Sequence, residues 1–267
     1  MHPRDGEDAP VPGAVRALAG GQPLRLVWLH HAGGRTWQVG TGPRRRFAKW
    51  APAGGPVDLA REAVRLAWAV AWTPVPRVLG SGADAHGSWL LTAGLPGRSA
   101  ADPRWAGDPA VAVPAVGAAL RALHDALPVP GCPFSWSVAD RMADARRRSS
   151  LRLVDPAQWQ AEHRSLTVPA ALALAADVPD VDRLVVCHGD AAVPNTLLDE
   201  HGRWTGHVDL GLLGTADRWA DLAVATWSSR WTHGPGWEER LLEAYGVEPD
   251  PDRTRYYRLL WDLTSGA

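Results

Sequence analysis

Cysteine and long apolar runs are both scarce in this sequence. Its 267 residues include two cysteines, Cys132 and Cys187, too few for a disulfide framework or a four-ligand metal site. No run approaches the roughly 18 apolar residues of a membrane-spanning helix. The polar residues 1–13 lack the apolar segment of a signal peptide. These absences exclude a small disulfide-rich secreted domain and a helical membrane protein, and we expect reduced thiols in a cytoplasmic protein.

Neither sign of charge predominates in this sequence. The formal net charge is -1, so no overall field attracts nucleic acid or an anionic membrane. We therefore expect a small-molecule substrate, no nucleic-acid or membrane partner, and a monomer.

Lysine is nearly absent. Of 28 basic residues, Lys49 is the single lysine. An arginine bias is typical of a coding bias, but a retained lysine indicates a site that needs a compact ammonium group. Tryptophan is in excess, with 15 Trp against 2 Phe and 3 Tyr, and such amphipathic rings are suited to core positions and cleft walls.

The first hundred residues predict a small sheet that carries one helix. Alternating apolar residues indicate strands, and the 3.6-residue periodicity after residue 56 indicates a helix, which Pro74 and Pro76 prevent from continuing. The expected strands are 24–30, 35–39, 45–51 and 89–92, and the expected helix is 56–71.

The remainder is predominantly helical in pattern. The expected helices are 111–127, 138–148, 168–176, 216–227, 237–245 and 251–263, with short strands at 184–187, 195–199 and 204–209. The composite is an α+β protein of two lobes joined by a Gly/Pro-rich connector at 94–97. We expect a nucleotide-binding lobe over 1–95, a catalytic and substrate-binding lobe over 96–267, and a ligand in the cleft between them.

A group of polar residues follows the strand at 184–187. Asp190 comes directly after His188-Gly189, Asn195 lies five positions later, and Asp209 begins Asp-Leu-Gly after the next hairpin. Phosphoryl transfer needs a carboxylate that accepts the hydroxyl proton, and an amide oxygen and a second carboxylate that hold Mg²⁺. The spacing matches the catalytic and metal motifs of protein kinases.

Each of these residues alone has a structural explanation. Asp190 and Asn195 are common turn residues, Asp209 could cap a loop, and His188 is better explained as a structural histidine than as a base. Their occurrence together and in order favours the catalytic interpretation.

The first lobe supplies the second half of such a site. Lys49 lies on the expected third strand, and Glu62 lies thirteen residues later in the helix. A kinase needs this pair because the lysine contacts the α- and β-phosphates and the glutamate holds it. A solvent-exposed helical glutamate is the alternative for Glu62.

Two backbone segments complete the expected nucleotide site. The turn at Gly34, Arg35 and Thr36 could cover phosphates with N–H groups, although it is equally consistent with a plain hairpin turn. Ala93 C=O and Leu95 N–H are the expected contacts for adenine.

The run Val185–Ala223 resembles the signature region of aminoglycoside 3'-phosphotransferases and of the related streptomycin 3''-kinases. Phe47-Ala48-Lys49 and Ala60-Arg61-Glu62 resemble the family's lysine and helix glutamate, and 132–134 resembles its Cys-Pro-Phe turn. The resemblance covers roughly residues 24 to 264.

This resemblance implies a protein-kinase-like fold, ATP with Mg²⁺, and an aminoglycoside acceptor, with antibiotic resistance as the outcome. It implies that Asp190 is the catalytic base and that Asn195 and Asp209 are metal ligands. It further implies acidic contacts to substrate ammonium groups from Asp155, Glu162 and Asp262.

Three departures bear on this interpretation. Leu212 stands where the family usually has arginine, and Ala192-Val193 replaces its usual pair before Pro-Asn. The loop 156–161 contains no acidic residue, and fewer carboxylates reduce the complementarity to a polycation.

Other functions remain open at this stage. A kinase of another hydroxylated metabolite or antibiotic fits the acid-poor loop. A protein kinase is disfavoured because no Ala-Pro-Glu motif follows Asp209. A non-catalytic nucleotide-binding protein is disfavoured because Lys49, Asp190, Asn195 and Asp209 are all present.

Overall fold

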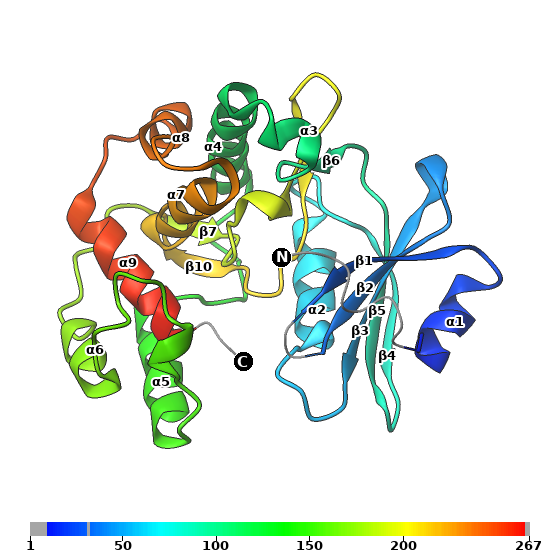
Figure 1. The fold of residues 1–267 in the computed structure, drawn as a ribbon, viewed down its shortest axis with the longest axis horizontal. Helices are drawn as coiled ribbons and strands as arrows, with labels where there is room; N and C mark the ends of the chain where they lie inside the picture. The colour runs from blue at the N-terminus through cyan, green and yellow to red at the C-terminus, as the bar shows by residue number, and fades with distance from the viewer. Residues whose placement is uncertain (1–9, 31–32, 265–267) are drawn as a thin grey trace. The chain divides into compact units, whose positions relative to one another are not determined.

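The computed structural model describes residues 10–30 and 33–264. The polar stretch 1–9 considered above lies outside the described residues. The chain divides into two compact units: the first is Met1–Pro96 with Gly206–Gly211, and the second is Gly97–Thr205 with Leu212–Ala267. The fold is α+β, with sheet concentrated in the first unit and helices in the second (Figure 1).

The first unit is built on a five-stranded antiparallel sheet of order β1-β2-β3-β5-β4. The strands are β1 (Leu24–Leu29), β2 (Arg35–Val39), β3 (Arg46–Pro52), β4 (Val78–Ala83) and β5 (Gly87–Ala93), with a 3-10 turn η2 (Gly42–Arg44) before β3. Lys49 sits in the middle of the sheet, paired with Thr36 of β2 and Leu90 of β5.

Helices α1 (Gly13–Ala19) and α2 (Leu59–Ala69) cover opposite faces of this sheet (Figure 1). Val15 of α1 packs in a core with Ala48 of β3. Because side chains alternate across a strand, Lys49 then points to the face that carries α2. Asp58 begins α2 by accepting the N–H of Arg61 at 2.9 Å, and the helix presents Glu62 to the lysine.

Strand β4 was not expected from the sequence. Glycines weaken a strand pattern, and β4 contains Gly80 and Gly82. A Cβ at Gly82 would lie 2.7 Å from the Trp89 ring. The glycines therefore make room for the indole of the neighbouring strand, which local pattern does not reveal.

The second unit is mainly helical (Figure 1). Its helices are α3 (Pro103–Ala106), α4 (Pro109–Ala126), α5 (Val138–Ser150), α6 (Val168–Leu174), α7 (Trp219–His233), α8 (Glu238–Tyr245) and α9 (Pro251–Thr264). Its shorter elements are β6 (Arg98–Ser99), η3 (Pro156–Gln158), β7 (Leu184–Cys187), η4 (Val193–Asn195), β8 (Thr196–Leu198), β9 (Trp204–His207) and β10 (Gly214–Asp217). Helix α4 packs on α8, and α7 packs on α8 and α9.

The expected helix 216–227 was wrong at both ends. Ala216 and Asp217 belong to β10, which pairs with β7. Helix α7 instead runs from Trp219 to His233 and ends at Gly234, whose φ of 87° is unfavourable for other residues. Trp227, Ser228, Ser229 and Trp231 therefore lie on a helix. Within the described ranges, no helix is both long and apolar enough to cross a membrane.

Candidate active site

Lys49 is held by two carboxylates in the first unit. Its Nζ lies 2.7 Å and 2.9 Å from the two carboxylate oxygens of Glu62, and it also donates a short hydrogen bond to Asp209. The lysine and glutamate side chains are largely buried, whereas the Asp209 side chain is 41% exposed. The structure thus brings Lys49, Glu62 and Asp209 together across a separation of 160 residues.

These charges keep Lys49 protonated. Burial by itself would lower its pKa, but the charges of Asp209 and Glu62 and their hydrogen bonds more than offset burial, and the pKa of Lys49 is raised. The group is a permanent cation at neutral pH, as a ligand for phosphate oxygens must be.

Asp209 has an unusual backbone conformation. Its φ is 64°, in the left-handed region that costs most residues energy and that aspartate tolerates better than most. Gly211 follows, and a Cβ there would lie 3.7 Å from Glu62. The turn aims the Asp209 carboxylate at Lys49, and strained backbone of this kind is frequent at functional sites.

The other residues expected at the nucleotide site lie in two parts of the first unit. Gly34 accepts the His30 N–H at 2.7 Å, while Arg35 and Thr36 are the first residues of β2. Ala93 ends β5, and its N–H donates to the Arg77 C=O at 2.9 Å. The Leu95 C=O accepts a hydrogen bond from Arg45.

Asp190 and Asn195 are joined in the second unit. Asn195 donates from Nδ2 to the Asp190 C=O at 2.9 Å and to its Oδ2 at 3.0 Å. The Asn195 side chain is fixed because the residue lies in η4 and is buried. This arrangement orients the Asp190 carboxylate, which remains partly accessible.

Gly189 permits the close turn before Asp190. Its φ is 86°, and a Cβ would lie 2.3 Å from the Leu212 C=O. No residue with a side chain fits there without a shift of the backbone. Leu212, the departure noted in the sequence, thus contributes its main chain to the packing of this loop.

Asp221 is a functional candidate that the sequence reasoning missed. It is fully buried and accepts the N–H of His188 at 2.6 Å and of Gly189 at 2.9 Å. His124 Nε2 lies 3.0 Å from Asp221 Oδ2, and its Nδ1 lies 2.9 Å from the Tyr245 hydroxyl. The network holds the backbone that leads into Asp190.

The charge of Asp221 is maintained despite its burial. Burial by itself would raise its pKa, but the hydrogen bond and charge of His124 and the N–H of Gly189 more than offset that effect, and the pKa of Asp221 is lowered. Its position within the run Val185–Ala223 was the available signal, but the spacing of the kinase motifs does not include it.

The three carboxylates expected at the acceptor site have different surroundings. Asp155 is exposed and caps η3 by accepting the Ala157 N–H at 2.9 Å. Glu162 is exposed, with an oxygen 3.9 Å from Nη1 of Arg258. Asp262 is 4% exposed. The structure therefore leaves Asp155 and Glu162 accessible but places Asp262 inside the protein.

Asp262 is occupied by contacts within the second unit. Its Oδ2 accepts the Gln160 N–H at 3.1 Å and lies 2.7 Å from Nδ1 of His163. These bonds fasten the loop that contains Glu162 to α9. In this arrangement Asp262 positions the loop and does not present its Oδ2 to solvent.

The described residues contain one cluster with the composition of a metal site, His124, Cys187 and Asp221. All three are buried, and burial together with the nearby acids Asp221 and Asp217 raises the pKa of the Cys187 thiol well above its usual value. Cys187 donates to the Asp217 C=O. Because the three side chains already hydrogen-bond within the protein, their proximity is explained by packing.

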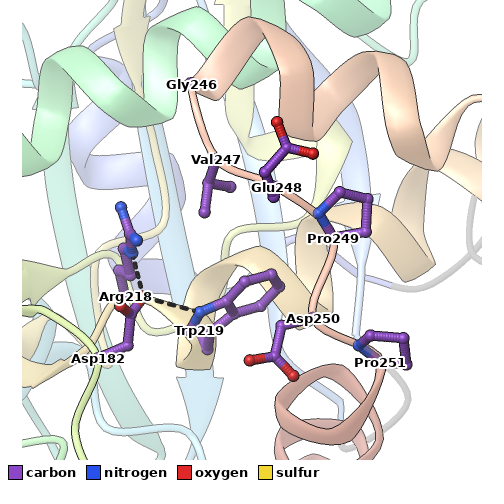
Figure 2. A pocket seen from close by; sticks show the side chains of 9 residues that line it. All are labelled: Asp182, Arg218, Trp219, Gly246, Val247, Glu248, Pro249, Asp250 and Pro251. Carbon is purple, nitrogen blue, oxygen red and sulfur yellow. Dashed lines mark hydrogen bonds and ion pairs between the residues drawn. The ribbon is translucent and has the colours of Figure 1, made fainter.

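A surface cavity of about 510 Å³ lies elsewhere in the second unit. Figure 2 shows Asp182 in its wall, receiving hydrogen bonds from Arg218 at 2.5 Å and from the Trp219 indole at 2.9 Å. None of the residues expected at the catalytic or acceptor site is among those that line it. The cavity is therefore distinct from the site around Asp190.

The chain matches a known protein family and several proteins of known activity. Residues 26–257 match the model of the phosphotransferase enzyme family. The chain is 38% identical to an aminoglycoside 3'-phosphotransferase of Streptomyces fradiae, with 89% of this chain and 97% of that protein covered. It is 36% identical to a streptomycin 3''-kinase of Streptomyces griseus, with 97% and 99% covered.

Solved structures give the same result. The aminoglycoside phosphotransferase APH(3'')-Id of Streptomyces rimosus superposes with a TM-score of 0.80 at 32% identity, with 94% of this chain and 96% of that chain covered. A type VIII aminoglycoside 3'-phosphotransferase superposes with a TM-score of 0.79 at 33% identity, with 94% and 97% covered. The Streptomyces rimosus protein has also been solved with ADP and streptomycin.

Proposed function

The chain belongs to the phosphotransferase enzyme family, and we propose that it transfers the γ-phosphoryl group of ATP to a hydroxyl group of an aminoglycoside antibiotic. The 3'-hydroxyl is the expected position, because two of the most similar relatives are 3'-phosphotransferases, at 38% and 39% identity. The biological outcome of this reaction is resistance to the antibiotic.

The observation that carries the reaction type is the ion-pair set of Lys49, Glu62 and Asp209. In phosphoryl transfer the protein mainly positions charged oxygens and stabilises the charge that develops on them. Lys49 would contact phosphate oxygens of the donor while Glu62 fixes its position. The turn at Gly34, Arg35 and Thr36 would face the phosphates, and Ala93 and Leu95 would hydrogen-bond adenine.

Asp190 is assigned as the catalytic base. The acceptor oxygen forms a bond to the γ-phosphorus, the bond from that phosphorus to the β,γ-bridging oxygen breaks, and the hydroxyl proton passes to the Asp190 carboxylate. The products are the phosphorylated acceptor and ADP. Asn195 supports this role because its amide holds one Asp190 oxygen at 3.0 Å, which directs the carboxylate.

The residues fit a magnesium ion. Magnesium prefers oxygen ligands, and the Asp209 carboxylate is 41% exposed. Both recorded hydrogen bonds of Asn195 Nδ2 go to Asp190, so its Oδ1 is the atom suited to a cation. Asp209 and Asn195 would hold the ion, which supplies charge neutralisation for the phosphates. Asp209 would then contact two cations, the Lys49 ammonium group and the magnesium ion.

The acceptor class is supported by the relatives and by two exposed acids. Asp155 and Glu162 could pair with ammonium groups of an aminosugar. Asp262 would contribute through the loop that it anchors. ATP is a cytoplasmic metabolite, so we place the reaction in the cytoplasm.

A kinase of another small hydroxylated compound is the second candidate. The acid-poor loop 156–161 favours it, as does the burial of Asp262. Fewer accessible carboxylates reduce the affinity for a polycation.

The test is coupled ADP release from the purified protein with Mg-ATP. The acceptor panel contains kanamycin, neomycin, streptomycin and a set of alcohols without amino groups. Release with an aminoglycoside and none from the Asp190→Asn variant is expected, and the position of the phosphate is read from the product by NMR. Release with the other alcohols alone would replace the acceptor class, and folded protein without release would overturn the enzymatic proposal.

A further inference from the structure

Two tryptophans stack at the end of α7. The rings of Trp227 and Trp231 have centroids 5.3 Å apart at an interplanar angle of 35°. Trp227 is buried, whereas Trp231 is 48% exposed. The buried ring of Trp227 thus packs against that of Trp231, and about half of Trp231 is accessible to solvent.

This part of α7 contacts the loop that follows Asp190. The Ser228 hydroxyl oxygen accepts the Val193 N–H at 2.9 Å, and both groups are buried. Val193 begins η4, which contains Asn195. Ser228 follows Trp227 directly in the sequence, so the tryptophan pair begins where the catalytic loop is fastened to the helix.

Trp227 also contacts the loop that contains Glu162, through His163. The His163 ring packs edge-on against Trp227, with centroids 5.8 Å apart. The Arg258 guanidinium lies over the Trp227 ring at 5.1 Å and is also the partner of Glu162 at 3.9 Å. Trp227 therefore contacts both a neighbour and an ion-pair partner of Glu162.

Two carboxylates of this region, Asp262 and Glu162, already have partners within the protein. Oδ2 of Asp262 is used by His163 and Gln160. The charge of Glu162 is partly balanced by Arg258. An exposed indole offers a different means of binding, since it attracts an ammonium group through its π face and packs against the apolar face of a ring.

We infer that Trp231 is a specificity-determining residue of the acceptor subsite, on which a ring bearing ammonium groups packs while Glu162 pairs with one of those groups. The inference rests on the proposed aminoglycoside kinase activity. Trp227 packs against Trp231 and holds its ring in place. Ser228 joins this part of α7 to the loop that follows Asp190.

The experiment compares Trp231→Ala, Trp231→Phe and Trp72→Ala. Trp72 is a matched control because it is 52% exposed and lies in the first unit. KM and kcat are measured for one aminoglycoside and for ATP. For Trp231→Ala we expect the acceptor KM to rise about five- to tenfold, since cation–π contacts are worth about 1 kcal/mol or somewhat more.

The values of kcat, of the KM for ATP and of thermal stability distinguish a role in acceptor binding from a purely structural role. For Trp231→Ala, kcat and the KM for ATP should change by less than about twofold, and Trp231→Phe should recover most of the acceptor affinity because it keeps an aromatic face. Trp72→Ala should behave as the unaltered protein. Thermal unfolding of each variant identifies any loss of fold.

Failure of the inference about Trp231 can be distinguished from failure of the proposed kinase activity. An unchanged acceptor KM in Trp231→Ala, with turnover intact, overturns the inference and leaves the proposed function standing. An equal rise in the KM for ATP also overturns it, because the residue would then act on the protein as a whole. Absence of turnover by the unaltered protein with every acceptor overturns both.

Discussion

The Asp221 carboxylate accepts the backbone N–H of His188 at 2.6 Å. A second N–H from the next residue, Gly189, reaches the other oxygen at 2.9 Å. Because both bonds end on a buried charge, they hold the peptide units immediately before Asp190 more firmly than neutral hydrogen bonds would. The position of the proposed base thus depends on a helix residue more than thirty positions later.

Asp221→Asn should therefore lower both stability and kcat. An amide presents only one oxygen, and its NH₂ group would face a backbone N–H. Hydrogen bonds to charged groups contribute about 1.5–3 kcal/mol each, so we expect a loss of about 2–4 kcal/mol in the free energy of unfolding, measured in urea. The KM for ATP should change less than kcat.

Asp182→Asn is the control for this change. Asp182 also accepts two hydrogen bonds, from Arg218 and Trp219, but it lies at the surface, where such pairs contribute about 0–1 kcal/mol. Equal effects of the two substitutions would contradict the positioning role of Asp221.

The pH dependence of stability provides a separate prediction for Asp221. Its pKa is lower in the folded protein than in the unfolded chain, where an aspartate titrates near pH 4. Its contribution is therefore complete above about pH 4 and is lost as the pH falls through the folded-state pKa. The difference in unfolding free energy between the protein and Asp221→Asn should narrow on acidification below about pH 4, measured by urea titrations at each pH. A constant difference would exclude a charge-based role.

Substitution of Asp190 should change kcat, whereas substitution of Lys49 should change chiefly the KM for ATP. Asp190→Ala removes the proton acceptor and should abolish turnover while ATP binding, measured by calorimetry, is retained. Lys49→Ala removes the partner of Glu62 and Asp209 and should chiefly raise the KM for ATP. Equal and mild losses of kcat in both variants would contradict the two assignments.

Gly189→Ala tests the close approach of two main-chain segments. A Cβ at this position would lie 2.3 Å from the Leu212 C=O, and φ is 86°. We expect a loss of more than about 3 kcal/mol in stability, or a shifted loop with little activity, since both the contact and the backbone conformation are unfavourable. Gly131→Ala is the matched control: its φ is 91°, but its Cβ would have no neighbour within 4 Å.

Gly131→Ala should cost only about 1–2 kcal/mol, the strain of a left-handed residue. Unfolding free energies of the two variants are compared under identical conditions. A similar loss in both would mean that backbone conformation alone, not the contact with Leu212, requires glycine at position 189.

The sequence predicted the fold class, because binary patterns and the order of motifs are local properties. The strands around Lys49 were recognisable from alternation, and the helix of Glu62 was recognisable from its 3.6-residue periodicity and the prolines that follow it. Strand β4 was missed because Gly80 and Gly82 weaken its pattern, and their purpose, space for Trp89, is visible only across the sheet. Helix α7 was misplaced because the pairing of β10 with β7 takes its first expected residues.

The candidate site was predictable where chemistry fixes residue type and spacing. Asp190, Asn195 and Asp209 follow from that reasoning, and their roles remain predictions. Asp221, Ser228 and Trp231 were not identified because their relevance comes from tertiary contacts with the loop of Asp190 and its surroundings. The excess of tryptophan is plain in the sequence, but it does not show which tryptophan is functional. The stacking of Trp227 on the exposed Trp231 is what suggests a role for Trp231 in binding the acceptor.

Removal of the Asp262 carboxylate should lower stability, whereas removal of the Glu162 charge should not. Asp262 is buried with its Oδ2 2.7 Å from His163 Nδ1, and removal of a partner that leaves a buried polar group unsatisfied costs about 1–3 kcal/mol. Asp262→Ala should therefore lower the unfolding free energy by an amount in that range and raise the acceptor KM indirectly. Glu162 is exposed, so Glu162→Gln should leave stability within about 0.5 kcal/mol and raise the acceptor KM alone. Since Asp262→Asn keeps the shape and one acceptor oxygen, it should recover part of the lost stability. If Asp262→Ala were fully stable but had a higher acceptor KM, the residue would contact the substrate directly, as the family resemblance implies, and its anchoring role would be wrong.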